Sequence, residues 1–313
     1  MWGRRGRTTR RSGVAACVAV AVVGGWLIGT PHAQTFSART DLVHMSVIVT
    51  DRQGNLVNGL TADDFEIVDG GAARPILTFA QGPPPSDAGV PLHVGVMLDK
   101  SESMELDARV AANAVVRFVE AMPEAADVTL VEFDSSVRVS RFNPSSYPQL
   151  FARVRDRASG RETALYDAIA RYVDTTAARP GLHLLVVFTD GGDSGRGLNA
   201  SDVQMRLRQG NVFVYGVVYL ENQSPTERAR QRAITTQLVR DTGGEAHFPS
   251  SERDITRIYD RIRQEMAARY TLGYELPAEA APGQYRRVSV RPRNPDGRGL
   301  RLRARSGYLV PEP

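Results

Sequence analysis

Cysteine is nearly absent from this chain of 313 residues. The single cysteine, Cys17, lies in an apolar stretch close to the N-terminus. The rest of the chain can therefore form neither an internal disulfide nor a zinc site with thiolate ligands. Packing must hold the folded state together, and a hydrophobic content of 42% is enough for one large core or two modest ones.

Lysine and histidine are scarce as well. Lys100 is the only lysine. The histidines that follow the N-terminal stretch are too scattered to predict a catalytic or metal-binding set. They are His44, His93, His183 and His247. The net charge of +4 does not indicate a nucleic-acid binder, because five of the 39 basic side chains lie in the first eleven residues. Without them, 34 basic side chains face 35 acidic ones.

Arginine is abundant near the C-terminus, in "YRRVSVRPR" and "LRLRARS". No aromatic side chains interleave with these arginines, as they would in a surface that stacks nucleic-acid bases. The pattern instead predicts one solvated strand face whose charges discourage pairing at a sheet edge.

Residues 1–33 have the composition of a secretory signal. A basic start is followed by the apolar run "GVAACVAVAVVGGWLI" and then by "TPHA". We expect export and cleavage after Ala33, so that the mature protein starts near Gln34 and resides in the periplasm, on the cell surface or outside the cell. An uncleaved N-terminal anchor is the alternative, because Pro31 departs from the small-residue pattern before a cleavage site.

The two ends of the mature chain both show strand-like alternation. Residues 41–80 contain short alternating runs separated by turns, and a Pro/Gly-rich linker follows at 81–91. Alternation returns in residues 270–313. Because neither end is large enough for a stable pair of sheets, we predict that they pack together as one small β-sandwich.

The middle of the chain, residues 92–269, alternates between apolar runs and helical periodicity. The apolar runs are "LHVGVML", "DVTLVEF", "HLLVVFT" and "NVFVYGVVY". Strands that are apolar on both faces, with helices between them, predict a doubly wound, mostly parallel α/β sheet of Rossmann-like type, inserted into the β-sandwich. A ligand site is expected beyond the carboxyl ends of these strands.

Oxygen-bearing side chains occur where two of these strands end and where a predicted helix begins. Asp99, Ser101 and Ser103 follow one strand, Asp190 follows another, and Thr163 precedes the helix. Hard oxygen donors without sulfur or imidazole suit Mg²⁺, or Mn²⁺ or Ca²⁺, rather than zinc. Each motif alone could be a helix cap or a turn. Together they predict a metal site on an exposed rim where three loops converge.

Three of these segments resemble a known site. "DKSES", "ETALYDA" and "FTDGGD" are similar to the metal-ion-dependent adhesion site of the von Willebrand factor type A (VWA) domain. The layout, with "VIVTDRQGNLVNGLTADDFEIVDGG" before the domain and "YTLGYEL" and "RSGYLVP" after it, resembles the acidobacterial-type VWFA-related proteins over nearly all of the mature chain. The resemblance implies the metal ligands Asp99, Ser101, Ser103, Thr163 and Asp190. It also implies that a protein partner supplies an Asp or Glu carboxylate to the metal's open position.

Two residues depart from the first motif of the family. Lys100 and Glu102 stand where threonine or serine and glycine are usual. Both are variable positions, so the departures are expected to change surface charge and affinity rather than metal binding. Outside the ligand set, Asp193 is expected to serve a turn, and Asp167 and Tyr166 to pack or cap.

The sequence therefore predicts an exported, non-enzymatic, metal-ion-dependent protein-binding module of the adhesion type. A structural or assembly subunit of an envelope complex, with a metal that only stabilises the fold, is the alternative. A serine hydrolase with Ser101 as nucleophile and Lys100 as base is disfavoured, because neighbouring residues at a strand end point apart. The sequence also lacks the G-x-S-x-G and S-x-x-K patterns.

Overall fold

The computed structural model describes residues 42–82, 90–104, 108–156, 160, 162–176, 179–221, 223–293 and 299–311, all within one unit, Thr40–Pro313. The predicted signal segment, most of the predicted linker and the side chain of Ser103 fall outside this description. Within the described ranges, no helix has the length and apolar character needed to cross a membrane.

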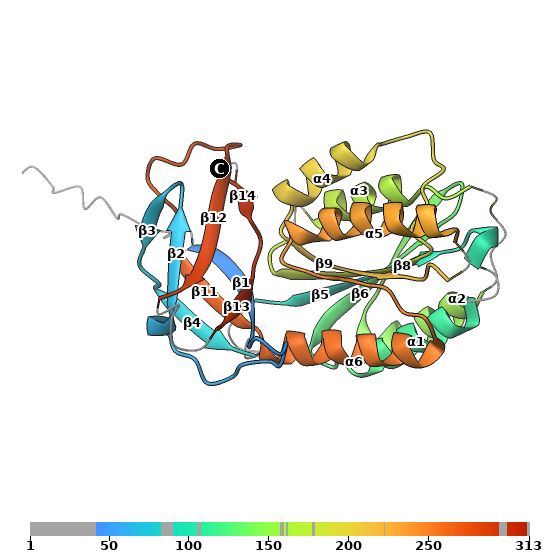
Figure 1. Cartoon of the computed structure of the whole chain (residues 1–313), viewed down its shortest axis with the longest axis horizontal. Helices are drawn as coiled ribbons and strands as arrows, with labels where there is room; N and C mark the ends of the chain where they lie inside the picture. Colours follow the sequence, from blue (N-terminus) through green and yellow to red (C-terminus); the bar gives the residue numbers. More distant parts are fainter. Residues whose placement is uncertain are drawn as a thin grey trace, which may run out of the picture. The chain divides into compact units, whose positions relative to one another are not determined.

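Among the described residues, the central sheet has six strands in the order β10-β9-β8-β5-β6-β7. Figure 1 labels four of them, β9, β8, β5 and β6. They are β5 (Leu92–Asp99), β6 (Ala125–Phe133), β7 (Val137–Phe142), β8 (Leu182–Thr189), β9 (Val212–Val218) and β10 (Ala246–His247). All pairs are parallel except the edge pair of β6 and β7, which is antiparallel. Strands β5 and β8 are buried along their whole length, which explains their uninterrupted apolar sequences. Strand β7 was not predicted from the sequence, and its residues are half-buried or exposed.

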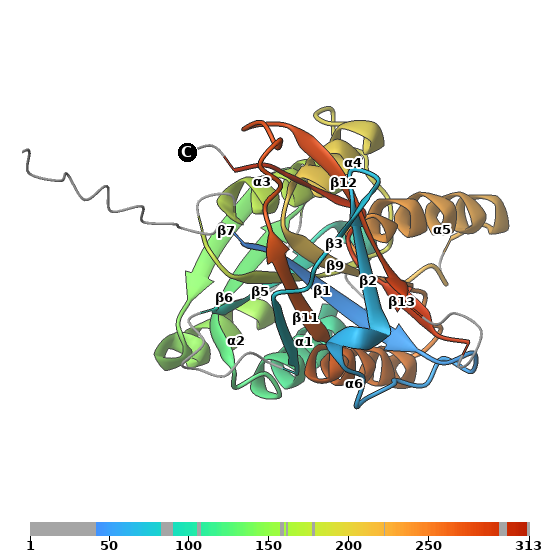
Figure 2. The same ribbon diagram turned by 90° about the vertical axis from the view of Figure 1, so that its left-hand side faces the viewer.

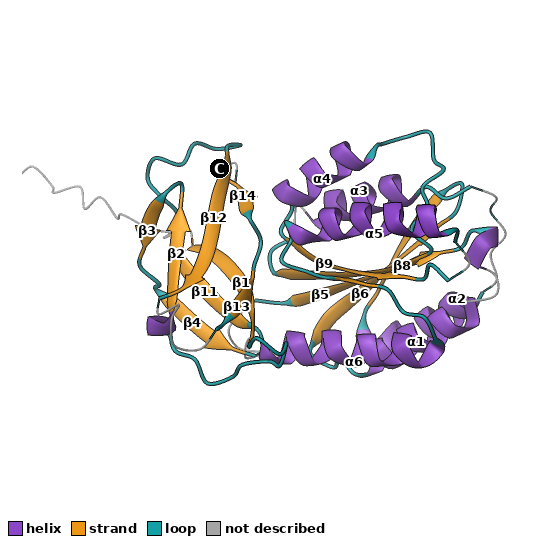
Figure 3. Ribbon diagram, viewed as in Figure 1, coloured by secondary structure: helices purple, strands orange, loops and turns teal. Residues whose placement is uncertain are grey.

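In the described part of the chain, six α-helices lie on the two faces of this sheet (Figure 3). They are α1 (Ala108–Glu120), α2 (Tyr147–Arg155), α3 (Leu165–Thr176), α4 (Ala200–Gln209), α5 (Pro225–Arg240) and α6 (Glu252–Ala268), and the short 3-10 turns are η1 (Ala62–Asp64), η2 (Glu102–Met104) and η3 (Pro144–Ser146). Helices α1, α2 and α6 share one core with the sheet, and α3, α4 and α5 share the other. The apolar face of α3, made by Leu165, Ile169 and Tyr172, is buried in the second core.

The strands from the two ends of the chain form two antiparallel sheets (Figure 2). One sheet has the order β13-β1-β11-β4, with β1 (Leu42–Thr50), β4 (Thr78–Gln81), β11 (Tyr270–Glu275) and β13 (Arg301–Arg303). The other has the order β14-β12-β2-β3, with β2 (Phe65–Asp69), β3 (Ala72–Arg74), β12 (Tyr285–Pro292) and β14 (Gly307–Leu309). One apolar cluster fills the space between them, including Met45, Phe65, Ile67, Tyr270 and Leu272. The predicted fold class is therefore confirmed.

The C-terminal arginines do not form one solvated strand face, which corrects the sequence analysis. Arg286 on β12 is buried, and its Nε donates a hydrogen bond of 2.8 Å to Oδ1 of Asp69, which is completely buried. Arg287 and Arg291, on the same strand, are exposed. Successive side chains of a strand point to opposite faces, so only the inward arginine can neutralise the carboxylate in the β core.

Two histidines are neighbours in space, which also differs from the expectation. His93 on β5 pairs in register with His183 on β8, and their rings stack with centroids 4.9 Å apart. His93 Nδ1 lies 3.1 Å from Asp127 Oδ2, and His183 Nε2 lies 3.0 Å from the Arg179 carbonyl oxygen. Both histidines lie at the amino ends of their strands, opposite to the predicted metal site.

Candidate metal site

Asp99 is the last residue of β5, and among the described residues its carboxylate accepts hydrogen bonds from neutral donors. Its Oδ1 accepts a hydrogen bond of 3.0 Å from the Ser101 backbone N–H, and its Oδ2 accepts one of 2.6 Å from the Thr189 hydroxyl. The residue is only 4% exposed, so the expectation of an exposed rim is wrong at this position. Burial raises the pKa of Asp99 to about 6, and the nearby charge of Asp190 contributes to the increase.

The loop after Asp99 turns back against a later segment of the chain. Ser101 is buried and forms a parallel bridge with Gly160, whose carbonyl oxygen accepts a hydrogen bond of 3.0 Å from Glu102 N–H. Gly160 also lies directly against Asp134. A Cβ at position 160 would be 2.1 Å from Asp134 Cβ, so the packing here requires glycine. Ser103 follows in the 3-10 turn η2.

Thr163 is held between two other loops. Its N–H donates a hydrogen bond of 2.8 Å to Ser194 Oγ, and its carbonyl oxygen accepts hydrogen bonds from Ser194 and Gly195 N–H. The next residue, Ala164, donates to the carbonyl oxygen of Asp134, which follows strand β6. Thr163 is buried, and its position depends on both neighbouring strand ends.

Asp190 directly follows β8 and is half-buried. Its Oδ1 accepts a hydrogen bond of 3.3 Å from Gly192 N–H. Gly191 has φ +85°, and a Cβ there would lie 2.9 Å from a Val218 methyl group, so this turn requires glycine.

The three predicted loops are joined in a closed set of contacts. Thr189 connects the Asp190 loop to Asp99, Ser194 connects it to Thr163, and Gly160 connects the segment before Thr163 to Ser101. The structure thus brings together the segments that carry the predicted ligands. Thr189 was missed by the sequence analysis, although it stands in "FTDGGD", because its contact with Asp99 depends on the pairing of β5 with β8.

Asp193, which was expected to serve a turn, accepts a hydrogen bond from the start of α3, and Asp167 accepts one from a backbone N–H group. Asp193 Oδ1 accepts a hydrogen bond of 3.0 Å from Tyr166 N–H in the first turn of α3. Asp167 Oδ1 accepts one of 3.1 Å from Leu198 N–H. Both carboxylates fix the loop that follows Asp190.

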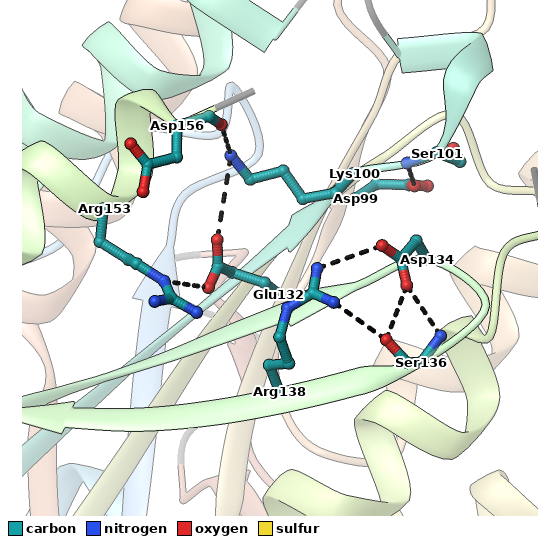
Figure 4. A network of polar contacts seen from close by, with 9 residues as sticks. All are labelled: Asp99, Lys100, Ser101, Glu132, Asp134, Ser136, Arg138, Arg153 and Asp156. Carbon is teal, nitrogen blue, oxygen red and sulfur yellow. Dashed lines mark hydrogen bonds and ion pairs between the residues drawn. The ribbon is translucent and has the colours of Figure 1, made fainter. Parts of the chain in front are cut away.

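Lys100 does not alter the surface charge, which corrects the expectation. It is buried, and its ammonium group donates to the carbonyl oxygens of Val154, at 3.2 Å, and Asp156 at the end of α2 (Figure 4). Its Nζ also lies 4.0 Å from Glu132 Oε1. Figure 4 shows this side chain running away from the Asp99 carboxylate. The ammonium group therefore does not neutralise Asp99.

The donor set fits a hard divalent cation. Within the described ranges, no three His, Cys, Asp or Glu side chains gather closely enough to hold a metal ion. The candidate set has two carboxylates, Asp99 and Asp190, and its other members are hydroxyls. A buried carboxylate without a cationic partner is costly, and a cation bound beside Asp99 would offset that cost.

A family model of the von Willebrand factor type A domain matches residues 93–261. The chain belongs to the von Willebrand factor type A family. The matched range runs from β5 into α6 and contains all five predicted ligands of the VWA domain. No curated protein matches the chain.

Solved structures resemble the chain at low sequence identity. A von Willebrand factor type A protein from Catenulispora acidiphila has 15% identity and a TM-score of 0.47, covering 88% of this chain and 76% of that one. The open conformation of the pilus adhesin SpaC from Lactobacillus rhamnosus GG has 9% identity and a TM-score of 0.49. The match covers 79% of this chain and 48% of the adhesin chain. Proximal thread matrix protein 1 from the mussel byssus, with a zinc-occupied MIDAS motif, has 11% identity and a TM-score of 0.46. The match covers 60% of this chain and 50% of the byssus protein chain. The chain thus spans about half the length of the last two.

Proposed function

We propose that the mature protein is an exported, metal-ion-dependent protein-binding module that grips an acidic side chain of a protein partner through a divalent cation. Membership of the VWA family supports this proposal, and so does the joining of the three ligand-bearing segments. Asp99 and Asp190 would supply carboxylates to Mg²⁺, Mn²⁺ or Ca²⁺, and Ser101, Ser103 and Thr163 would supply hydroxyl oxygens. When bound, the cation supplies a positive charge that attracts a carboxylate from outside.

One observation carries the proposal. Asp99 is buried, its hydrogen-bond donors among the described residues are neutral, and Asp190 is close enough for its charge to raise the pKa of Asp99. Asp134, at the neighbouring strand end, is buried as well, but its carboxylate accepts a hydrogen bond of 3.1 Å from the Arg138 guanidinium. Within the described residues, the chain thus supplies a cation for Asp134 and none for Asp99.

Calorimetry with Mg²⁺, Mn²⁺ and Ca²⁺ tests the metal part. We expect binding heat for the mature wild type and for the control Asp134→Asn, and none for Asp99→Ala. Asp134 is a matched control because it is buried at the same edge of the sheet and is paired with the Arg138 guanidinium. If the wild type shows no binding heat at millimolar ion concentration, the segment "DKSES" serves only as a helix cap.

Pull-downs from envelope extract, with Mg²⁺ or with chelator, test the partner part. We expect a protein that is retained by the wild type in Mg²⁺ and lost with chelator or with Asp99→Ala. If metal raises thermal stability but leaves the retained proteins unchanged, the protein is instead the structural or assembly subunit. The hydrolase alternative gains no support, because the Lys100 ammonium is bound by α2 carbonyl groups.

Export is a separate part of the proposal and rests on the composition of residues 1–33. A reporter fused after residue 40 should cross the inner membrane. N-terminal sequencing of the mature protein should start near Gln34. Full-length protein in the cytoplasm would contradict export without affecting the metal site.

A further inference from the structure

A large groove lies away from the candidate metal site, between helices α4 and α5 and the C-terminal strands. Its volume is about 1290 Å³, and a second hollow of about 470 Å³ adjoins it through shared lining residues, Arg208, Asp241 and Ser306. None of the five predicted metal ligands lines either hollow. This volume is larger than the roughly 300 to 1,000 Å³ that is usual for small-molecule sites.

The two walls of the groove are fastened to each other. Ser306 N–H donates a hydrogen bond of 2.9 Å to the Asp241 carbonyl oxygen, and Arg303 forms an ion pair of 3.0 Å with Glu245. Gly243 has φ +85°, and a Cβ there would lie 2.8 Å from the Ala304 carbonyl carbon. The groove is therefore preformed, and a ligand need not bear the cost of ordering it.

The lining carries an excess of positive charge. Its two acidic residues are already paired, Asp241 with Arg208 at 2.6 Å and Glu245 with Arg303. Three exposed arginines of the lining have no ion-pair partner in the part of the chain that the structure describes. We call them the surplus arginines of the groove; they are Arg232, Arg240 and Arg287.

The uncharged part of the lining favours a polypeptide over a nucleic acid. Met205 is 56% exposed, and Ala229 and Ala233 are exposed along α5, so an aliphatic side chain can pack there. Tyr285 is the single aromatic residue among the lining residues, which leaves no row of rings on which bases could stack. Guanidinium groups bind carboxylates in a bidentate manner.

We propose that this groove binds an extended acidic segment of a protein partner, with its carboxylates on the surplus arginines Arg232, Arg240 and Arg287. The groove is a second interaction surface and does not depend on the metal site.

The test uses the mature chain with excess EDTA, so that the metal site does not contribute. The probe is a fluorescein-labelled peptide of about twelve residues, with glutamates spaced by serine and glycine and a single leucine. We expect anisotropy to show binding at low ionic strength that weakens as salt is added. The triple variant Arg232→Gln, Arg240→Gln, Arg287→Gln should lose about tenfold or more in affinity.

A matched triple variant separates the groove from general surface charge. Arg141, Arg171 and Arg301 are exposed, have no ion pair in the described residues and do not line either hollow. Changing these three to glutamine should leave peptide affinity within about twofold. Three results would overturn the proposal: no binding at low salt, equal losses in both variants, or tighter groove-dependent binding of a single-stranded oligonucleotide of the same charge.

Discussion

Two buried carboxylates at one edge of the sheet differ in their partners rather than in their burial. Asp99 is 4% exposed and Asp134 is 7% exposed. Asp134 accepts hydrogen bonds from Ser136 and from the Arg138 guanidinium, and these contacts and the charge of Arg138 keep its pKa low despite burial. The pKa of Asp99 is raised instead, mainly by burial. At the scale of single residues, Asp99 is distinguished from Asp134 because no cationic side chain pairs with it in the part of the chain that the structure describes.

Replacing each carboxylate by an amide should have opposite effects on stability. In chelator, Asp99→Asn should leave the free energy of unfolding unchanged or raise it by up to about 2 kcal/mol, because an uncompensated buried charge is removed. Asp134→Asn should lower it by about 1 kcal/mol, because the charged hydrogen bond to Arg138 is lost. Urea unfolding measures both. A marked loss for Asp99→Asn would show that its carboxylate serves mainly to hold the loop.

His183 should make the protein less stable in acid. Burial lowers the pKa of its imidazole to about 4. The hydrogen bond to the Arg179 backbone and the charge of Asp127 oppose this decrease, while the charges of His93 and Arg179 add to it. The unfolded chain takes up this proton near its ordinary pKa of about 6.5, whereas the folded chain does so only near 4. Stability is therefore lost as the pH falls between these values.

His183→Gln tests this pH dependence. Between about pH 7 and pH 4.5 the wild type should lose about 2 kcal/mol more of its free energy of unfolding than the variant does. Because each protein is compared with itself at two pH values, the packing cost of the substitution cancels. Identical losses in the two proteins would contradict the buried, neutral imidazole.

At the scale of elements, Lys100 joins the end of β5 to the end of α2. Its ammonium group binds two carbonyl oxygens near the α2 C-terminus and lies 4.0 Å from Glu132, which also pairs with Arg153 at 2.7 Å (Figure 4). Carbonyl groups at a helix C-terminus lack partners within the helix, and a cation stabilises them. The loop that carries Asp99 is thereby attached to a helix on one face of the sheet.

Removing this ammonium group should loosen α2. Lys100→Met should lower the free energy of unfolding by about 2 to 4 kcal/mol, because two buried carbonyl groups lose their donor. Hydrogen exchange should accelerate in α2 more than in α5. The control is Arg155→Met at the same helix end, where the side chain is exposed, and its effect should stay below about 0.5 kcal/mol. Equal effects of both substitutions would refute the role of Lys100.

At the scale of the whole molecule, one buried carboxylate joins both ends of the chain. Asp69 on β2 accepts hydrogen bonds from Arg286 on β12, from Tyr274 on β11 at 2.8 Å and from Tyr308 on β14 at 2.7 Å. Strand β2 comes from the N-terminal segment, and the other three come from the C-terminal segment. The two sheets are therefore one structural unit around an ionic core.

Arg286→Met should destabilise this unit by about 3 to 5 kcal/mol, because Asp69 would be left buried without a cation. Arg287→Met is the matched control: it changes the next residue of the same strand, which is exposed, and should cost less than about 0.5 kcal/mol. Limited proteolysis of the Arg286 variant should cut residues 42–82 and 270–311 together. Cleavage of one end with the other end protected would argue against a shared core.

The amino-acid sequence by itself determined the fold class and the candidate ligand residues. Periodicity is a local property: alternation predicts strands, and spacings of three and four predict helices, so the layers could be read directly. Oxygen-bearing residues at strand ends could also be read, because the carboxyl ends of parallel strands meet at one edge.

Only the tertiary structure decided which charged groups meet. The pairing of β5 with β8 places Thr189 on Asp99, the path of α2 places its carbonyl groups on Lys100, and the pairing of β2 with β12 places Arg286 on Asp69. Such contacts join residues 54 to 217 positions apart. Local patterns carry no information about them, because packing of the whole core selects the partners of each buried charge.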